Sequence, residues 1–193
     1  MSKKFILSVV VVGCSIFVAA GARAEMGHDK KGKDSEMPKV TAKAIIKGTQ
    51  PNSPIIGRVD LTQKSDGVKV IAHLLNVPPG QHGFHVHENG SCAEAGQAAG
   101  SHFNPDQMQH GLLPKDGFKA AHAGDLGNIT IDADGSGYYS EMLDGLNLSD
   151  GKYNIAGKAV ILHEKVDDFG QPVGNAGGRI GCGIIEIIQE DQW

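Results

Sequence analysis

The sequence contains no basic run and is short of positive charge. Lysine and arginine together number 18 against 22 aspartates and glutamates, which gives the 193-residue chain a formal net charge of −4. Proteins that bind nucleic acid neutralise its phosphates with clustered lysine and arginine side chains. The chain is therefore predicted to have no nucleic-acid partner.

Apolar segments long enough for a membrane span are also missing. The longest run, Phe5 to Ala20, is shorter than the roughly 20 residues that a transmembrane helix needs. Two lysines precede it and Ala22-Arg23-Ala24 follows it, a pattern typical of a secretory signal peptide cleaved after Ala24. We expect an exported, periplasmic protein without a membrane-spanning segment. Lipoprotein processing at Cys14 is the less favoured alternative, because the apolar run continues beyond that residue.

The segment that follows the predicted cleavage site is polar. Without residues 1–24 the chain would have 169 residues and a net charge of −7, because three cations and no acids are removed. Residues 25–39 are rich in lysine and aspartate and are predicted to form a flexible tail. The remaining segment, 40–193, is long enough for one domain with a hydrophobic core.

Cysteine is scarce, and only Cys92 and Cys182 would remain once Cys14 leaves with the signal peptide. Two cysteines in an oxidising compartment are expected to form one disulfide. Closing so long a loop would contribute about 4 kcal/mol if the stabilisation comes from chain entropy. Two free thiols acting as metal ligands are the alternative, which export disfavours.

Long helical periods with caps and internal repeats are both absent from the sequence. Short segments rich in valine, isoleucine and threonine are instead bounded by glycine, proline, asparagine or aspartate, a pattern typical of β-strands. About eight such segments occur, at 40–48, 55–63, 67–77, 83–88, 127–135, 137–143, 157–164 and 182–189. Their number and spacing predict one all-β domain, an antiparallel sandwich or barrel.

Two long stretches between these segments, 89–125 and 164–181, are rich in glycine and poor in strand signals. Each begins directly after a segment that carries histidine. Long irregular loops in a compact domain are uncommon and usually functional. We therefore expect the two loops to build the functional site.

The segment "GFHVHE" places His85 and His87 two residues apart. Side chains alternate between the faces of a strand, so both imidazoles point the same way and could hold one metal ion. An isolated His-x-His is more often a pair of surface histidines. His163, in the segment "ILHEKVDD", adds a third strand histidine, and three imidazoles without a thiolate suit copper, zinc, iron or nickel.

The loop 89–125 contributes a second set of donors. His102, His110, His122 and Asp125 offer three nitrogens and one carboxylate oxygen, which suits a tetrahedral zinc ion. The spacing of these residues indicates that two metals could be present. It does not show whether the two sites share a ligand.

Five strings in this order carry a specific resemblance: "GFHVHE", "SHFNP", "HAGDLGN", "LHEKVDD" and "GNAGGRIGCGIIEI". Together they resemble the Cu/Zn superoxide dismutase family over residues 40–190, and "HENGSC" is similar to its exported bacterial members. The resemblance implies an eight-stranded Greek-key β-barrel with two long functional loops. It also implies that the chain converts superoxide to dioxygen and hydrogen peroxide at a copper that alternates between Cu(II) and Cu(I).

The resemblance further implies one copper and one zinc per subunit, with His102 bridging the two ions as an imidazolate. The implied ligands are His85, His87, His102 and His163 for copper, and His102, His110, His122 and Asp125 for zinc. A bound cation favours the deprotonated form of its ligand, which agrees with an imidazolate between two cations. In the implied cycle His102 takes up a proton and later gives it to the peroxide product.

Other matches to the family concern residues around the metals. Arg179 matches the arginine beside the copper, and Asp167 matches the aspartate that links a copper-ligand histidine to a zinc-ligand histidine. Cys92 and Cys182 match the family disulfide. A protein that buffers or delivers copper in the cell envelope is the alternative function, although such a carrier requires neither Arg179 nor the zinc set.

The chain also departs from the family pattern. The segment between His163 and Arg179 is short and lacks the usual cluster of charged residues that guide the substrate, and the segment between His110 and His122 is longer than usual. These departures leave substrate steering and the dimer interface open. A homodimer remains one of the assemblies that the resemblance allows.

Overall fold

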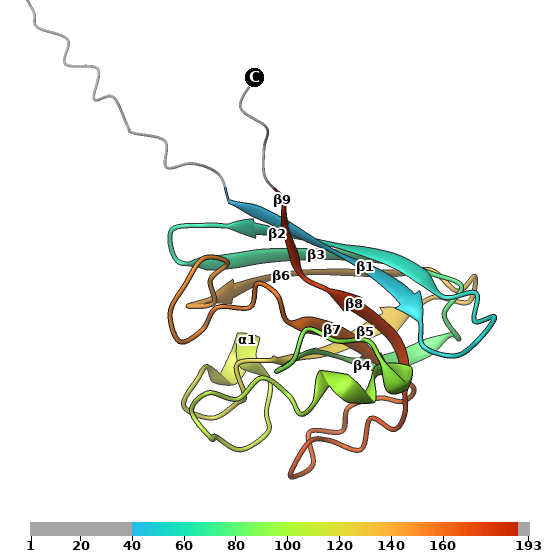
Figure 1. The fold of residues 1–193 in the computed structure, drawn as a ribbon. Coiled ribbons are helices and arrows are strands. Elements are labelled where there is room, and N and C mark those ends of the chain that lie inside the picture. Colours follow the sequence, from blue (N-terminus) through green and yellow to red (C-terminus); the bar gives the residue numbers. More distant parts are fainter. Residues whose placement is uncertain (1–39, 189–193) are drawn as a thin grey trace, which may run out of the picture. The chain divides into compact units, whose positions relative to one another are not determined.

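A computed structural model describes residues 40–188, which form an all-β fold (Figure 1). The predicted signal peptide, the polar tail and the alternative lipidation site at Cys14 lie outside the described residues. Within 40–188, no helix has both the length and the apolar character that crossing a membrane would require.

Each of the eight predicted segments overlaps a strand, although β4, β5 and β8 begin two or three residues earlier than predicted. The strands of the described range are β1 (Thr41–Gly48), β2 (Ile56–Gln63), β3 (Gly67–Leu75), β4 (Gly80–His87), β5 (Asp125–Ile131), β6 (Gly137–Asp144), β7 (Ala159–His163), β8 (Arg179–Ile184) and β9 (Glu186–Ile188). The last predicted segment is divided between β8 and β9, because the buried Ile185 turns away from β1. Its main-chain groups bond instead to Gly157 and Lys158, just before β7.

The strands close into an antiparallel barrel, which confirms the predicted fold. Their order is β2-β3-β6-β5-β4-β7-β8-β1, and β1 also pairs with β2 along its whole length. β8 pairs with the end of β1, and β9 pairs with its beginning, so the two together act as the eighth strand. The connections β3–β4 and β6–β7 each pass over two strands, as in a Greek key.

Alternation along the strands places one face of each in the core. In β1, Ala42, Ala44 and Ile46 are buried while the residues between them are partly or fully exposed. Burying each large aliphatic side chain stabilises the fold by about 1.5–3 kcal/mol. The strand β4 differs, because its last six residues are all buried. Another part of the chain must therefore cover the face of β4 that points away from the core.

The two predicted long loops cover β4. The first, residues 88–124, contains the 3-10 helix η1 (Glu94–Ala99) and the short helix α1 (Leu113–Asp116). It is fastened to β4 by main-chain hydrogen bonds from Phe103 N to Val86 O and from Val86 N to Gly124 O, both 2.9 Å. The second, residues 164–178, is fastened by the bond from Gly83 N to Lys165 O, 2.8 Å. In Figure 1 both loops lie along the lower side of the barrel, next to β4 and β7.

Candidate metal centre

The two histidines of β4 point away from the core and under the loops. Phe84 and Val86 belong to the hydrophobic core, whereas His85 and His87 face the other way and are 0% and 1% exposed. They are therefore not surface histidines. An imidazole buried this completely needs a partner for each ring nitrogen.

Four histidines meet on this side of the barrel. One ring nitrogen from each lies within 4.8 Å of those of the other three, in the group His85, His87, His102 and His163. The Nε2 atoms of His87 and His163 are 3.3 Å apart, and the rings of His85 and His102 are 4.3 Å apart between centroids. The first group thus brings together nitrogens from β4, β7 and the first long loop.

Hydrogen bonds to the other ring nitrogens decide which nitrogen is free. His87 Nδ1 donates to Gly100 O at 2.9 Å, which leaves Nε2 with its lone pair. His85 Nε2 donates to Asp167 Oδ2 at 2.8 Å, which leaves Nδ1 free. This Nδ1 is buried and has no hydrogen-bond partner. A buried polar atom without a partner is costly, so His85 is prepared to receive a cation.

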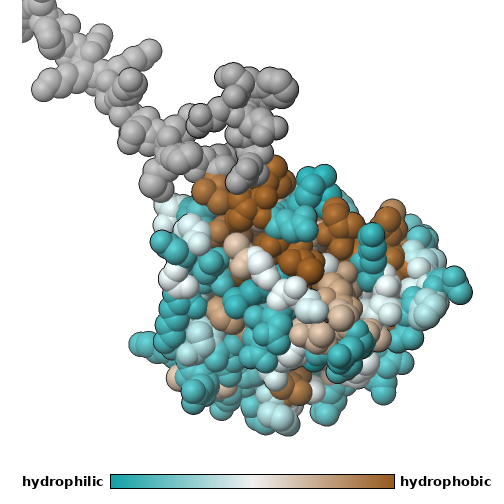
Figure 2. Space-filling model, viewed as in Figure 1, coloured by the Kyte–Doolittle hydropathy of each residue, from teal (hydrophilic) through white to brown (hydrophobic). Residues whose placement is uncertain are grey.

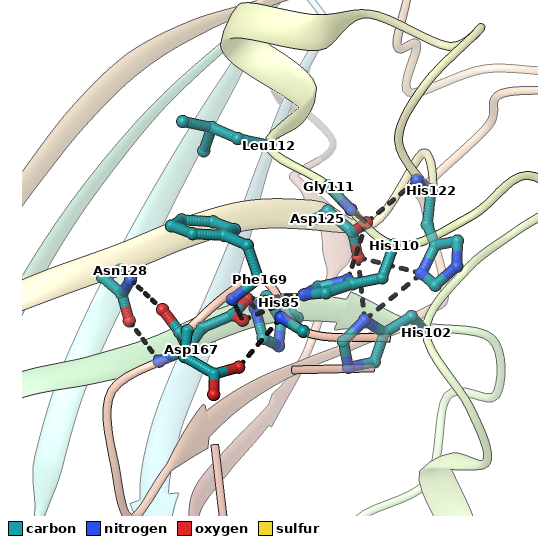
Figure 3. Close-up of polar contacts among 12 residues, drawn as sticks. His85, His102, His110, Gly111, Leu112, His122, Asp125, Asn128, Asp167 and Phe169 are labelled. Carbon is teal, nitrogen blue, oxygen red and sulfur yellow. Dashed lines mark hydrogen bonds and ion pairs between the residues drawn. The ribbon is translucent and has the colours of Figure 1, made fainter. Parts of the chain in front are cut away.

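A second group lies beside the first and shares His102 with it. Donor atoms of His102, His110, His122 and Asp125 lie within 4.8 Å of one another (Figure 3). Asp125 Oδ1 is 2.8 Å from His102 Nδ1 and 3.0 Å from His122 Nδ1, and its Oδ2 is 2.9 Å from His110 Nδ1. His110 Nδ1 is also buried, and its close approach to Asp125 Oδ2 does not have the geometry of a hydrogen bond.

Asp167 connects the two groups through a single carboxylate. Its Oδ2 accepts hydrogen bonds from Nε2 of His85 at 2.8 Å and from Nε2 of His110 at 2.9 Å (Figure 3). Asn128 on β5 holds the main chain of Asp167 through two hydrogen bonds, of 2.9 and 2.7 Å. The carboxylate therefore directs Nδ1 of one ring into the first group and Nδ1 of the other into the second.

Burial is the main reason that the ring pKa values of the first group are low. The pKa is about 2 for His87, about 3 for His163 and about 4 for His102. These imidazoles are neutral at neutral pH, which is the form that binds a metal ion. Burial also lowers the pKa of His110, but the neighbouring carboxylates of Asp125 and Asp167 outweigh it and raise that pKa to about 9. Burial alone would raise the pKa of Asp125, yet the surrounding histidines hold it well below its usual range.

The donor sets fit two metal ions on grounds independent of any resemblance. Two buried nitrogens without partners point into the two groups, and the second group offers three nitrogens and an oxygen, as zinc prefers. The first group offers four imidazole nitrogens and no thiolate, a set that suits copper(II).

A cleft of about 250 Å³ opens next to the first group. Arg179, at the start of β8, lines it together with His87, His102 and His163. The guanidinium is held by three main-chain carbonyls. Nη1 donates to Gly96 O at 2.6 Å and to Gln97 O at 3.4 Å, and Nη2 donates to Gly100 O at 2.6 Å. Within the described chain, Arg179 is the one permanently charged residue that lines this cleft.

Cys92 and Cys182 form a disulfide, with their Cα atoms 5.8 Å apart. This agrees with the predicted pairing. The bond ties the beginning of η1 to β8, and Arg179 ties the end of the same helix to β8. The two attachments fix the segment that supplies Gly100 O, the acceptor for His87.

Comparisons with known proteins agree with this geometry. The sequence pattern of the family described as copper/zinc superoxide dismutase (SODC) matches residues 55–185. The chain is 38% identical over 143 residues to the extracellular superoxide dismutase [Cu-Zn] of Caenorhabditis elegans, covering 70% of this chain and 63% of that protein. It is 37% identical over 150 residues to the protein of the same name from Haemonchus contortus, covering 74% and 79%.

The chain belongs to the copper/zinc superoxide dismutase family. A solved structure, described as a crystal structure analysis of the clock protein EA4, has the same fold with a TM-score of 0.70. It is 39% identical and covers 79% of this chain and 97% of that one. The match to the C. elegans protein spans a little under two thirds of its length, 63%. Both nematode relatives are named as extracellular enzymes, so the predicted likeness to exported bacterial members stays a prediction.

Every metal-ligand residue expected from the resemblance to superoxide dismutases lies in one of the two groups, and Asp167 lies between them. Two supporting residues were not predicted. Asn128 stands in the string "HAGDLGN", three residues after Asp125, so the sequence did place it close to a metal-ligand residue. Gln171 contacts His110 from the second loop, and no local pattern indicates that contact.

Proposed function

We propose that this chain disproportionates superoxide, converting two superoxide anions and two protons into one dioxygen and one hydrogen peroxide. The observation that carries the proposal is the shared residue His102, which belongs to both donor groups. Copper would be held by Nδ1 of His85 and by Nε2 of His87, His102 and His163. Zinc would be held by Nδ1 of His102, His110 and His122 and by Oδ1 of Asp125.

Copper, when bound, supplies a one-electron couple between Cu(II) and Cu(I). The protein contributes anion binding and proton handling. Arg179 presents the remaining N–H groups of its anchored guanidinium to an anion in the cleft, a planar donor set that suits an oxygen anion. His102 Nε2 would carry a proton only while it is not bound to copper, and it would donate that proton to the peroxide product. Asp125 keeps the opposite nitrogen of that ring, Nδ1, oriented toward the zinc position.

A metal and activity assay tests the proposal. After reconstitution with both metals, elemental analysis should find one copper and one zinc per chain, and superoxide generated by a radiolysis pulse should decay catalytically. His102→Gln should abolish this activity, whereas His73→Gln, on the exposed face of β3, should not change it. A chain that binds copper but leaves superoxide decay unaccelerated would favour the copper-carrier alternative.

We also propose that the protein is exported to the periplasm. The relatives named above are extracellular enzymes, and the segment 1–24 has the pattern of a signal peptide. N-terminal sequencing of protein from the periplasmic fraction should begin at Glu25. Fatty-acid labelling of the mature chain would instead support processing at Cys14.

We further propose a homodimer. Ile45 on β1 and Ile187 on β9 are 41% and 42% exposed, and Lys43 pairs with Glu186 between the same strands. Apolar residues gather over the side of the molecule that carries β1 and β9 in Figure 2. A two-fold axis there would cover the isoleucines and set lysine against glutamate. Sedimentation equilibrium should give a mass twice that of one chain. For Ile45→Glu it should give the mass of a single chain.

A further inference from the structure

His110 is the proposed zinc ligand that receives the most contacts from the second long loop. Its ring Nε2 lies 2.9 Å from both carboxylate oxygens of Asp167, and its Nδ1 faces Asp125 (Figure 3). Hydrogen bonds on the ring set the tautomer and the direction of the ring. They leave the position of the His110 main chain to other contacts.

Gln171 supplies those contacts. Its Oε1 accepts a hydrogen bond from His110 N at 3.0 Å, and its Nε2 donates to His110 O at 2.8 Å. Only one orientation of the side-chain amide satisfies both bonds, because one atom must accept and the other must donate. Among the described residues, no other protein group bonds to these two main-chain atoms of His110.

The residues that bond to the ring and to the main chain of His110 come from one short segment. Asp167 and Gln171 are four residues apart in the loop 164–178, and the same loop lines the cleft at Val173, Gly174 and Gly177. Gln171 is exposed, and the side-chain amide of an exposed glutamine usually bonds to water. Its two bonds instead join the two long loops, which are 61 residues apart in the chain at this contact.

We propose that Gln171 is a positioning residue that sets the main chain of His110 and thereby the geometry of the zinc site. This role rests on the proposed function, because it requires zinc at His110. Residues that orient a metal ligand typically change metal affinity by about 10- to 100-fold when they are replaced. Because Gln171 is exposed and water can substitute in part, we expect the low end, a loss of about tenfold.

Gln171→Met separates the hydrogen bonds from packing, since methionine keeps the length and volume of the side chain but cannot bond to His110. Gln81→Met is the matched control, because Gln81 is an exposed glutamine of β4 whose side chain makes no hydrogen bond within the described chain. Cobalt(II) is the probe, because its visible absorption reports both binding and the geometry of a tetrahedral site. Each full-length mature chain is freed of metal and titrated with cobalt(II).

We expect the unchanged chain and Gln81→Met to give the same tetrahedral spectrum and the same affinity. Gln171→Met should bind cobalt(II) about tenfold more weakly and with a shifted absorption band, and Gln171→Ala should behave like it. Equal affinity and an identical spectrum for Gln171→Met would overturn the role of Gln171 alone. No tetrahedral spectrum from the unchanged chain would overturn the proposed zinc site, and the role of Gln171 with it.

Discussion

Replacing Arg179 with alanine removes a permanent charge from the cleft and three hydrogen bonds to the segment that follows Cys92. The charge faces a negatively charged substrate in a protein with a formal net charge of −4, which the proposed removal of residues 1–24 would change to −7. The average field therefore repels superoxide, and capture depends on a local positive potential. Arg179 is the permanent cation that the structure places at this cleft.

The size of the effect follows from the contact that is lost. A charge-assisted hydrogen bond contributes about 1.5–3 kcal/mol, which corresponds to a rate change of roughly 10- to 150-fold. Arg179 is only partly buried, so solvent screens its charge and the low end applies. We expect the rate constant for superoxide decay to fall about tenfold. Arg179→Lys should keep part of the rate, because the charge remains while the planar geometry is lost.

The assay must separate the charge from the hydrogen bonds. Gly100 O accepts from both Arg179 Nη2 and His87 Nδ1, so His87 keeps its own acceptor when Arg179 is replaced. Copper content measured by elemental analysis should therefore be unchanged. Decay rates measured from low to physiological ionic strength should fall more steeply for the unchanged chain than for the alanine variant, because salt screens only a charge that is present. A fully metallated Arg179→Ala chain with an unchanged rate and an unchanged salt dependence would refute this reasoning.

Three further predictions concern the metals and the fold. Asp125→Ala should lose zinc but keep copper, because it removes the only oxygen donor of the zinc set. The control is Asp132→Ala, in the exposed turn after β5. Equal loss of both metals from Asp125→Ala would contradict the assignment. Thiol labelling of the denatured, unreduced protein should detect no free cysteine. Because the disulfide spans 90 residues, its reduction should lower the free energy of unfolding by about 4–5 kcal/mol. The metal-free chain should lose stability between pH 7 and pH 5, because the pKa values of the first histidine group are lowered from 6.5 to about 2–4 and the unfolded chain takes up protons first. The raised pKa of His110 opposes this loss only in small part, because most of its stabilising effect is already present at pH 7. Urea unfolding at both pH values measures the difference, and equal stabilities would argue against neutral, buried histidines.

The sequence by itself determined the features that depend on local pattern. Runs rich in valine, isoleucine and threonine, bounded by turn residues, indicated the barrel strands. Side chains alternate between the two faces of a strand. The same alternation put His85 and His87 on one face of β4. The scarcity of cysteine, taken with the export signal, left only one pairing for Cys92 and Cys182. The five ordered strings indicated the family, because they include every expected metal-ligand residue except His110.

Only the tertiary structure decided which nitrogen of each ring is available. That choice depends on what bonds to the opposite nitrogen, and the partners come from distant parts of the chain: Asp167 for His85, 82 residues away, and Gly100 for His87. The same holds for Gln171 and for the division of the last strand at Ile185, since neither leaves a local pattern. Periodicity reports the face of an element on which a residue lies. The identity of the group that approaches that face from another loop is a property of the folded chain.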